Sequence, residues 1–156
     1  MKWKSWAVIA IAVFTVACCG RHTKLPDGWY LLGAGSSEVL TPAIVTVHDF
    51  ASLRVDSLSE AQGMFRYRIT GQLNEEGTGR FARATEKAIG SRIAFLCDGR
   101  VVCTPAVHAR IEDGNFLIVL EDDPGGVRTR RIYARLEAAM HGLSLIHISE
   151  PTRLDV

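Results

Sequence analysis

The sequence predicts an α+β fold, in which two main helices pack on one face of a largely antiparallel sheet. Short stretches that alternate apolar and polar residues indicate half-buried strands. Two longer stretches carry apolar residues at helical spacing, and each of them ends at a glycine. The order along the chain is several strands, a helix, a hairpin, a strand and a helix. This order favours helices on one side of an antiparallel sheet, because a parallel sheet would alternate strand and helix throughout.

Four strands are expected before the first helix. They lie near residues 28–33, 43–47, 53–58 and 64–73. The first is bounded on both sides by turn-forming residues, and the second is β-branched and follows a proline. The last alternates aromatic or aliphatic residues with arginine and threonine, which is the pattern of a strand with one buried face. We expect these stretches to form most of the sheet.

The first helix is expected between Asn74 and Gly90. Asn74 is a suitable N-cap, and the acidic residues Glu75 and Glu76 suit the positive end of the helix dipole. Apolar residues then recur at helical spacing up to Gly90, which suits the left-handed conformation that ends many helices. The segment therefore has both a start and a stop signal.

A two-residue hairpin turn is expected at Asp98 and Gly99, between two β-rich runs. In the register that this turn implies, Cys103 lies opposite Ala94. Cys97 and Cys103 then point to opposite faces and lie on the order of 10 Å apart along the hairpin. A disulfide needs Cα atoms within roughly 7 Å. We therefore expect two unbridged cysteines that serve as small buried hydrophobes.

The remaining elements follow in quick succession. Pro105 should end the second strand of the hairpin. Residues 106–114 form a short connection, with room for one helical turn, that closes in a turn at Gly114. A strand is expected within 115–122, and a final helix at 127–142 is ended by its last glycine.

The N-terminus has the organisation of a bacterial lipoprotein signal. A basic tip precedes an apolar run of twelve residues that ends directly before Cys18, and about 20 would be needed to span a membrane. The residues before Cys18 resemble a lipobox, which predicts a signal peptide at 1–17, a lipid anchor at Cys18 and a tether at 18–27. The next cysteine competes as the lipidated residue, and a plainly cleaved signal is the alternative.

One domain is expected at 28–142. Residues 143–156 resemble a translated sequencing adapter and are predicted to be an artefactual tail, the alternative being a short final strand. Between the signal and this tail, residues 18–142 carry 15 basic and 15 acidic residues. Such a balance gives no basic stripe for nucleic acid.

No set of residues has the spacing that catalysis or metal binding requires. The histidines are scattered, without a paired spacing or a cluster with cysteine. Cys103 with His108 is the strongest nucleophile candidate, but nothing in the sequence orients the histidine. Asp122 and Asp123 precede a proline and are interpreted as a turn and a helix cap. We expect no catalytic residue, no cofactor and no metal.

The stretch from Leu73 to Gly142 resembles the head subdomain of the first periplasmic domain of SecD, in the SecDF translocation accessory. The shared features are a helix that ends at a glycine, an Asp-Gly turn, a strand that ends near Pro105, and a turn at Gly114 before a closing strand and helix. The resemblance covers about half of the chain and leaves residues 28–65 outside it. It implies a ferredoxin-like head on the extracytoplasmic side of a membrane.

The resemblance implies binding rather than chemistry, because its motif residues are turn and core types. We expect a non-enzymatic, lipid-anchored protein of the bacterial cell envelope, on the periplasmic side. Its expected partners are the membrane, through the anchor, and unfolded or exported polypeptides or other envelope proteins; nucleic acid is not expected. The alternative is a small envelope enzyme, such as a hydrolase, whose site is not visible in the sequence.

Overall fold

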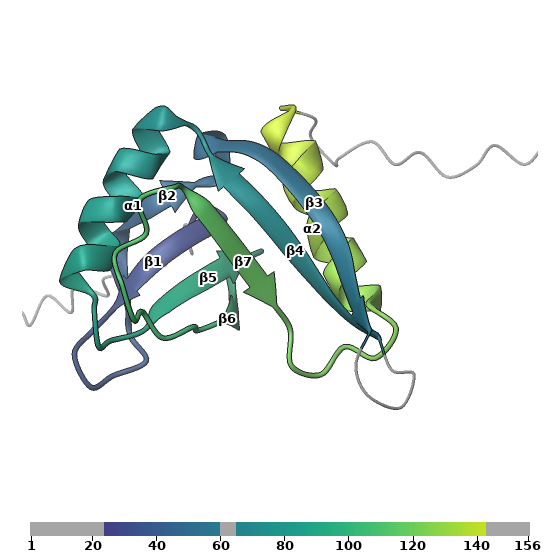
Figure 1. Cartoon of the computed structure of the whole chain (residues 1–156), viewed down its shortest axis with the longest axis horizontal. Coiled ribbons are helices and arrows are strands. Elements are labelled where there is room, and N and C mark those ends of the chain that lie inside the picture. Colours follow the sequence, from purple (N-terminus) through teal and green to yellow (C-terminus); the bar gives the residue numbers. More distant parts are fainter. Residues whose placement is uncertain (1–23, 60–64, 143–156) are drawn as a thin grey trace, which may run out of the picture.

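The computed structural model describes residues 24–59 and 65–142 (Figure 1) and confirms the α+β class. The predicted signal peptide, Cys18 and the predicted tail lie outside the described residues. The elements, in chain order, are β1 Gly28–Leu32, β2 Val39–Thr46, the 3-10 helix η1 Val47–Asp49, β3 Phe50–Ser59, β4 Phe65–Leu73, α1 Glu75–Lys87, β5 Ile93–Cys97, β6 Arg100–Cys103, β7 Asn115–Val119 and α2 Val127–Met140.

The described strands form two sheets. The first has the order β2-β1-β5-β6 and the second the order β3-β4-β7. Every pair of neighbouring strands in the described part of the chain is antiparallel, as expected. The expected single sheet is divided because the chain turns at η1 after β2, and β3 then pairs along its length with β4. Helix α1 packs against β2 and β4, whereas α2 packs against β3 and β4.

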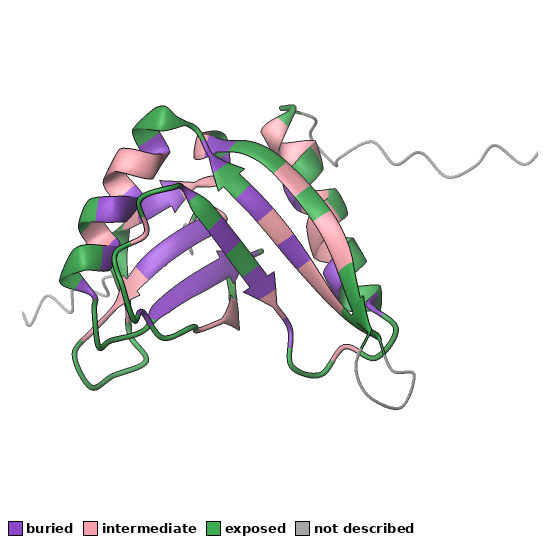
Figure 2. Ribbon diagram, viewed as in Figure 1, coloured by how far each residue is buried: buried purple, intermediate pink, exposed green. Residues whose placement is uncertain are grey.

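The main apolar core fills the space between the two sheets and the helices (Figure 2). Trp29 of β1 lies at its centre. The centroid of its ring is 5.1 Å from that of Phe95, 6.1 Å from that of Phe81 and 6.0 Å from that of Phe116. These partners come from β5, α1 and β7, so one side chain connects both sheets and a helix. Such aromatic pairs each add about 0.5–1.5 kcal/mol beyond the burial of their surface.

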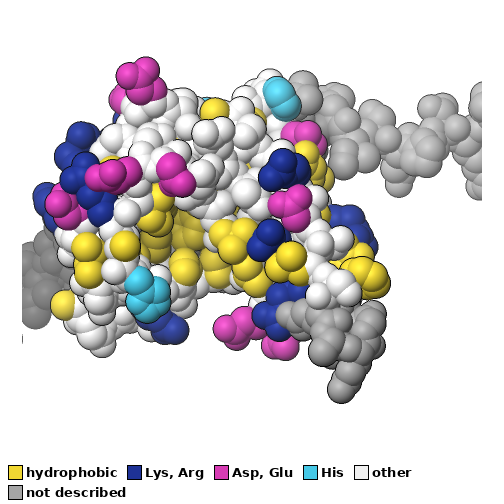
Figure 3. All heavy atoms as spheres, viewed as in Figure 1, with side chains coloured by type: hydrophobic (Ala, Val, Ile, Leu, Met, Phe, Trp, Pro, Cys, Tyr) yellow, Lys and Arg dark blue, Asp and Glu magenta, His cyan; other side chains and the backbone are white. Residues whose placement is uncertain are grey.

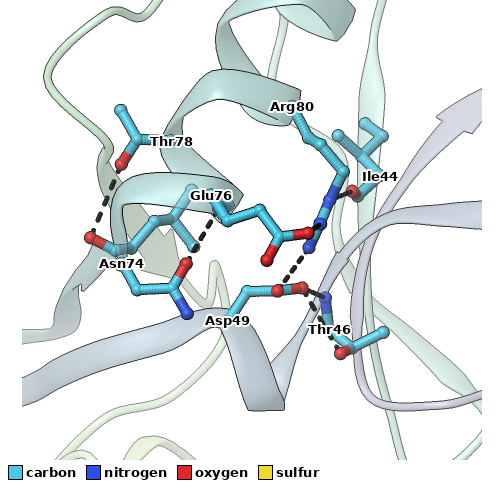
Figure 4. Close-up of polar contacts among 9 residues, drawn as sticks. Ile44, Thr46, Asp49, Asn74, Glu76, Thr78 and Arg80 are labelled. Atoms are coloured by element: carbon cyan, nitrogen blue, oxygen red, sulfur yellow. Dashed lines mark hydrogen bonds and ion pairs between the residues drawn. The ribbon is translucent and has the colours of Figure 1, made fainter.

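Helix α1 begins at Asn74, as expected, and the Asn74 side-chain oxygen accepts a hydrogen bond from the Gly77 N–H at 2.8 Å. Arg80, in the next turn, donates to the carboxylate of Asp49 (Figure 4). Asp49 also accepts from the Thr46 N–H at 2.8 Å. The Asp49 side chain is 14% exposed and that of Arg80 is 35% exposed, so the ion pair is partly shielded from solvent. These contacts fix α1 beside the η1 turn that divides the sheets.

The β5–β6 hairpin turns at the expected residues, since Asp98 and Gly99 have positive φ angles of 57° and 69°. A β-bulge in β6 then places Cys103 opposite Phe95 rather than Ala94. The prediction that the two hairpin cysteines point to opposite faces is therefore wrong, because the extra residue of the bulge returns Cys103 to the face that packs on the core. Both cysteines are nonetheless unbridged.

The segment that follows the hairpin differs in part from expectation. Residues 106–114 form a loop, without the helical turn that the sequence allowed, and an isolated bridge joins Arg92 to Ala106. The N-cap residue of α2 is Gly126 rather than an aspartate, but the Asp123 carboxylate accepts from the N–H groups of Arg128 at 3.0 Å and of Thr129 at 2.7 Å in the first turn. This capped start sets the position of α2.

Candidate functional site

A cleft of about 520 Å³ opens between the edge of β7 and the loop that follows β6. In the space-filling view it is a hollow near the middle of one face, with hydrophobic side chains exposed inside it (Figure 3). Trp29, Phe81 and Phe116 line it from the core, and residues 105–111 form one wall. Leu117 of β7 lines the opposite side. The aromatic core therefore reaches the surface here.

Hydrogen bonds hold the loop wall against α1 and the turn after it. The buried hydroxyl of Thr85 accepts from the Ile111 N–H at 3.0 Å. The Val107 N–H donates to the Ser91 carbonyl at 2.9 Å, and the Gly90 N–H donates to the Val107 carbonyl at 2.9 Å. The wall is thus fixed to α1 and to the turn after it at three points.

The cleft lies between two terminal strands, because β6 ends the first sheet and β7 ends the second. Along an antiparallel strand, the backbone N–H and C=O of one residue bond the neighbouring strand, and those of the next residue point away from it. The Leu73 N–H donates to the Gly114 carbonyl at 2.9 Å, and this bond sets the alternation so that the backbone of Leu117 faces away from β4. Val119 fits the same alternation. Burial raises the pKa of the Cys103 thiol of β6, and the backbone N–H of Val119 acts on this thiol and lowers that pKa. The strands therefore meet at Val119 and leave the edge open at Leu117.

A second hollow of about 560 Å³ continues the cleft along β6, and the two share Pro105 and Leu117 as lining residues. Apolar side chains are exposed on both strands, with Val101 of β6 49% exposed and Leu117 of β7 42% exposed. We call the two hollows together the edge groove. It offers apolar surface and an open strand edge side by side.

The ionisable residues that line the first hollow are basic. They are Arg68, His108 and Arg110, and no aspartate or glutamate of the described residues lines it. Arg110 is paired with Glu86 and Glu112, each at 3.1 Å. Arg68 forms no ion pair within the described part of the chain. Its Nε atom is buried and lacks a hydrogen-bond partner there. An acceptor supplied by a ligand would satisfy it.

The turn residues singled out in the sequence have different places relative to the groove. Pro105 lines both hollows. Asp98 and Gly99 lie at the hairpin turn, outside either lining. Gly114 directly precedes β7 and has a φ of 69°, and a Cβ atom there would lie 2.2 Å from the Thr78 hydroxyl oxygen. Glycine is therefore needed at the turn that sets the direction of the open edge.

The sequence did not single out Arg68 or Leu117. The alternation of β4 placed Arg68 on the polar face, where an arginine is ordinary. Leu117 stood within an apolar run that suited a buried strand. Both residues lie beside the groove because the strands form two separate sheets. The sequence pattern predicted a single sheet and therefore did not place them there.

The described residues offer weak nucleophiles. Burial raises the pKa of Cys97 and the pKa of Cys103 to about 11. Such thiols are almost wholly protonated at neutral pH and react slowly. Within residues 24–59 and 65–142, no three side chains of histidine, cysteine, aspartate or glutamate gather as metal ligands. The helices described there are too short or too polar to cross a membrane.

The fold and the groove define a small α+β domain with a preformed apolar groove beside an open strand edge. The chain belongs to the family of the SecDF P1 head subdomain, whose model matches residues 35–126. The resemblance found in the sequence is thus confirmed, but the family match begins well before Leu73 and ends at residue 126, before α2, which the predicted resemblance included. Residues 35–65, which the predicted resemblance left out, lie inside the match, and β3 and β4 form one sheet with β7.

Three similar proteins match this chain over part of their length. The protein translocase subunit SecD of Acidaminococcus fermentans is 37% identical over 68 residues, which are 44% of this chain and 16% of that protein. A crystal structure of SecDF in the super-membrane-facing form matches with 28% identity and a TM-score of 0.45, over 53% of this chain and 11% of that one. A second SecDF structure, described as a membrane component that enhances protein export, matches with 25% identity and a TM-score of 0.48. This match covers 62% of this chain and 42% of that one. This chain therefore spans about one-sixth of the curated relative.

Proposed function

We propose that this protein is a non-enzymatic, lipid-anchored protein of the bacterial envelope, whose head domain binds exported or envelope polypeptides as an accessory to protein translocation. The observation that carries the proposal is the edge groove, where an apolar floor lies beside an open strand edge. Membership of the SecDF P1 head family supports the translocation context, as does the name of the SecD relative.

An extended polypeptide segment can add to β7 as a further strand. The backbone N–H and C=O of Leu117 face the open edge and would bond the main chain of the segment. Alternate side chains of the segment would then lie over the floor that Trp29 and Phe116 provide. Main-chain bonds carry no sequence information, so this mode of binding suits many exported chains in their unfolded state. Folded proteins have their strand edges paired or covered and would bind poorly.

The lipid anchor belongs to the same proposal. A lipidated Cys18 would hold the head near the membrane, with residues 18–27 as a tether on the extracytoplasmic side. A tether of Gly, Pro and charged residues keeps the attached domain close while leaving its orientation free. Exported chains that emerge at the membrane would then meet the edge groove at a high local concentration.

Fluorescence anisotropy tests the binding of polypeptide. The full chain in lipid nanodiscs is titrated against labelled, unfolded segments of envelope proteins, with the same proteins in folded form as control. We expect weak binding of the unfolded segments, in the micromolar to submillimolar range, and none of the folded forms. Equal binding to both forms, or no binding up to millimolar concentration, would refute the proposed function.

A proline at Leu117 tests the strand edge itself. The N–H of Leu117 faces away from β4, so Leu117→Pro removes a donor to the ligand and no bond to β4. Leu117→Ala is the matched control, because it shortens the side chain and keeps the N–H. We expect Leu117→Pro to lower the affinity at least fivefold more than Leu117→Ala does, with thermal unfolding confirming that both variants are folded. Equal affinities of the two variants would exclude main-chain pairing at this edge.

A further inference from the structure

The basic lining of the first hollow indicates which segments it prefers, whereas the second hollow carries both acidic residues, Glu121 and Asp122, and arginines. We propose that the groove selects extended segments in which an acidic side chain lies among apolar ones, and that Arg68 binds the carboxylate. This inference rests on the proposed function and adds a preference to it. The strongest support is charge complementarity, since the described residues that line the first hollow include arginine and histidine but no acidic residue.

Arg68 is available for a ligand because the nearest acidic side chain on its sheet is engaged. Asp56 lies opposite Arg68 in the β3–β4 pairing. One oxygen of Asp56 accepts from the Thr70 hydroxyl at 2.9 Å, and the other lies 3.3 Å from Nε of Arg54. Arg68 is left without an ion pair among the described residues, and its Nε is buried and unsatisfied. Buried donors without a partner are rare and cost about 1–3 kcal/mol each.

Arg110, which also lines this hollow, differs from Arg68 because it already forms ion pairs within the protein. The guanidinium of Arg110 is bonded to Glu86 and Glu112. It is therefore neutralised by the protein itself and has little to gain from an acidic ligand. Arg68 offers the planar, bidentate donor set that carboxylates fit best.

The geometry of the sheet permits contact between Arg68 and an added strand. Arg68 pairs with Val119 in the β4–β7 register, and its side chain lies on the same face of the sheet as that of Leu117. A segment added to the edge of β7 would lie two strand spacings from β4, which is about 10 Å. A long arginine and a glutamate that reach toward each other over β7 can span this distance.

A peptide fits the groove better than an anionic lipid would. A lipid carboxylate or phosphate could satisfy Arg68, and an acyl chain could cover the apolar floor. Neither would use the backbone groups that β7 directs to its open edge at Leu117. The combination of an unsatisfied arginine, an apolar floor and an open strand edge matches a main chain with mixed side chains.

Three labelled peptides test the preference. Each is an extended apolar decapeptide, identical except for a central Glu, Gln or Lys, and each is titrated by anisotropy against the full chain in zwitterionic nanodiscs. We expect the Glu peptide to bind about fivefold to tenfold more tightly than the Gln peptide at low salt, as one charge-assisted hydrogen bond at a half-exposed site would give. The Lys peptide should bind most weakly, and the Glu advantage should shrink at high salt.

Variants assign the preference to one residue. Arg68→Met keeps the length of the side chain and should abolish the difference between Glu and Gln peptides without weakening the Gln peptide. Arg68→Lys should keep part of the difference, since it retains the charge and loses the bidentate fork. Arg83→Met removes an equal charge from the exposed face of α1, outside the edge groove, and should leave the preference intact.

The outcomes separate this inference from the proposed function. Equal binding of all three peptides to the wild-type chain would overturn the acidic preference and leave polypeptide binding in place. Absence of binding by every peptide would remove the proposed function itself. An oleate probe that displaces the peptides and depends on Arg68 would identify a lipid carboxylate as the occupant and overturn the inference.

Discussion

Replacing Gly71 by alanine should destabilise the protein, because the ring of Phe116 lies directly over this glycine. A Cβ atom at Gly71 would be 2.1 Å from Cζ and 2.5 Å from Cε2 of that ring. The ring would have to move on the order of 1 Å to regain ordinary contact at about 3.5 Å. Its centroid lies 4.7 Å from that of Phe50 and 6.0 Å from that of Trp29, which leave little room. Overpacking of this kind costs about 1–3 kcal/mol.

Scanning calorimetry of the full chain measures this cost. A loss of 1 kcal/mol lowers the melting temperature of a domain of this size by about 4 °C, so Gly71→Ala should melt roughly 4–12 °C below the wild type. Gly79→Ala is the matched control. Its Cβ would meet nothing closer than Arg83 at 3.7 Å, and alanine should stabilise the helix by up to about 1 kcal/mol. Identical melting temperatures for Gly71→Ala and wild type would show that Phe116 is not held as the structure places it.

Two further predictions concern the cysteines. Cys97 and Cys103 should titrate as free thiols after denaturation without reductant. In the folded chain at pH 8 their alkylation should be at least a hundredfold slower, and it should accelerate as the pH rises toward their pKa of about 11; fast alkylation at pH 8 would contradict the burial of both. Radiolabelled fatty acid should enter the wild-type chain and be lost in Cys18→Ala, and label that persists would place the anchor elsewhere.

The features that the sequence predicted correctly are those that neighbouring residues determine. The side chain of Asn74 caps α1 by accepting a hydrogen bond from the N–H of Gly77, only three residues further along the chain. Asp98 and Gly99 adopt positive φ angles because a two-residue hairpin turn demands them. The helix cap and the hairpin turn each depend on a few consecutive residues, so the sequence alone is enough to predict them.

The features that the sequence missed depend on contacts between distant segments. The bulge in β6 brings Cys103 to the core face, where its thiol meets the Val119 N–H of β7, in the other sheet. The η1 turn between the two sheets is held against α1 by the ion pair of Arg80 with Asp49, which lie 31 positions apart. Periodicity describes which face of a strand is buried, but it does not say with which sheet the strand pairs.

The edge groove remains open because its walls are anchored independently of what fills it. One wall is bonded to the buried Thr85, and the other is fixed by the Gly114 turn and by the packing of Phe116 on Gly71. Leu117 is 42% exposed between these anchored walls, although burial of its apolar surface would be favourable by about 25 cal/mol per Å². A segment that enters the groove recovers this free energy without first ordering the protein, and the cost of binding falls mainly on the segment. In the proposed mode of binding, a folded protein would first have to expose an extended segment, whereas an unfolded chain would lose only the entropy of ordering that segment. We therefore expect the groove to discriminate for the unfolded state of a polypeptide before it discriminates for sequence.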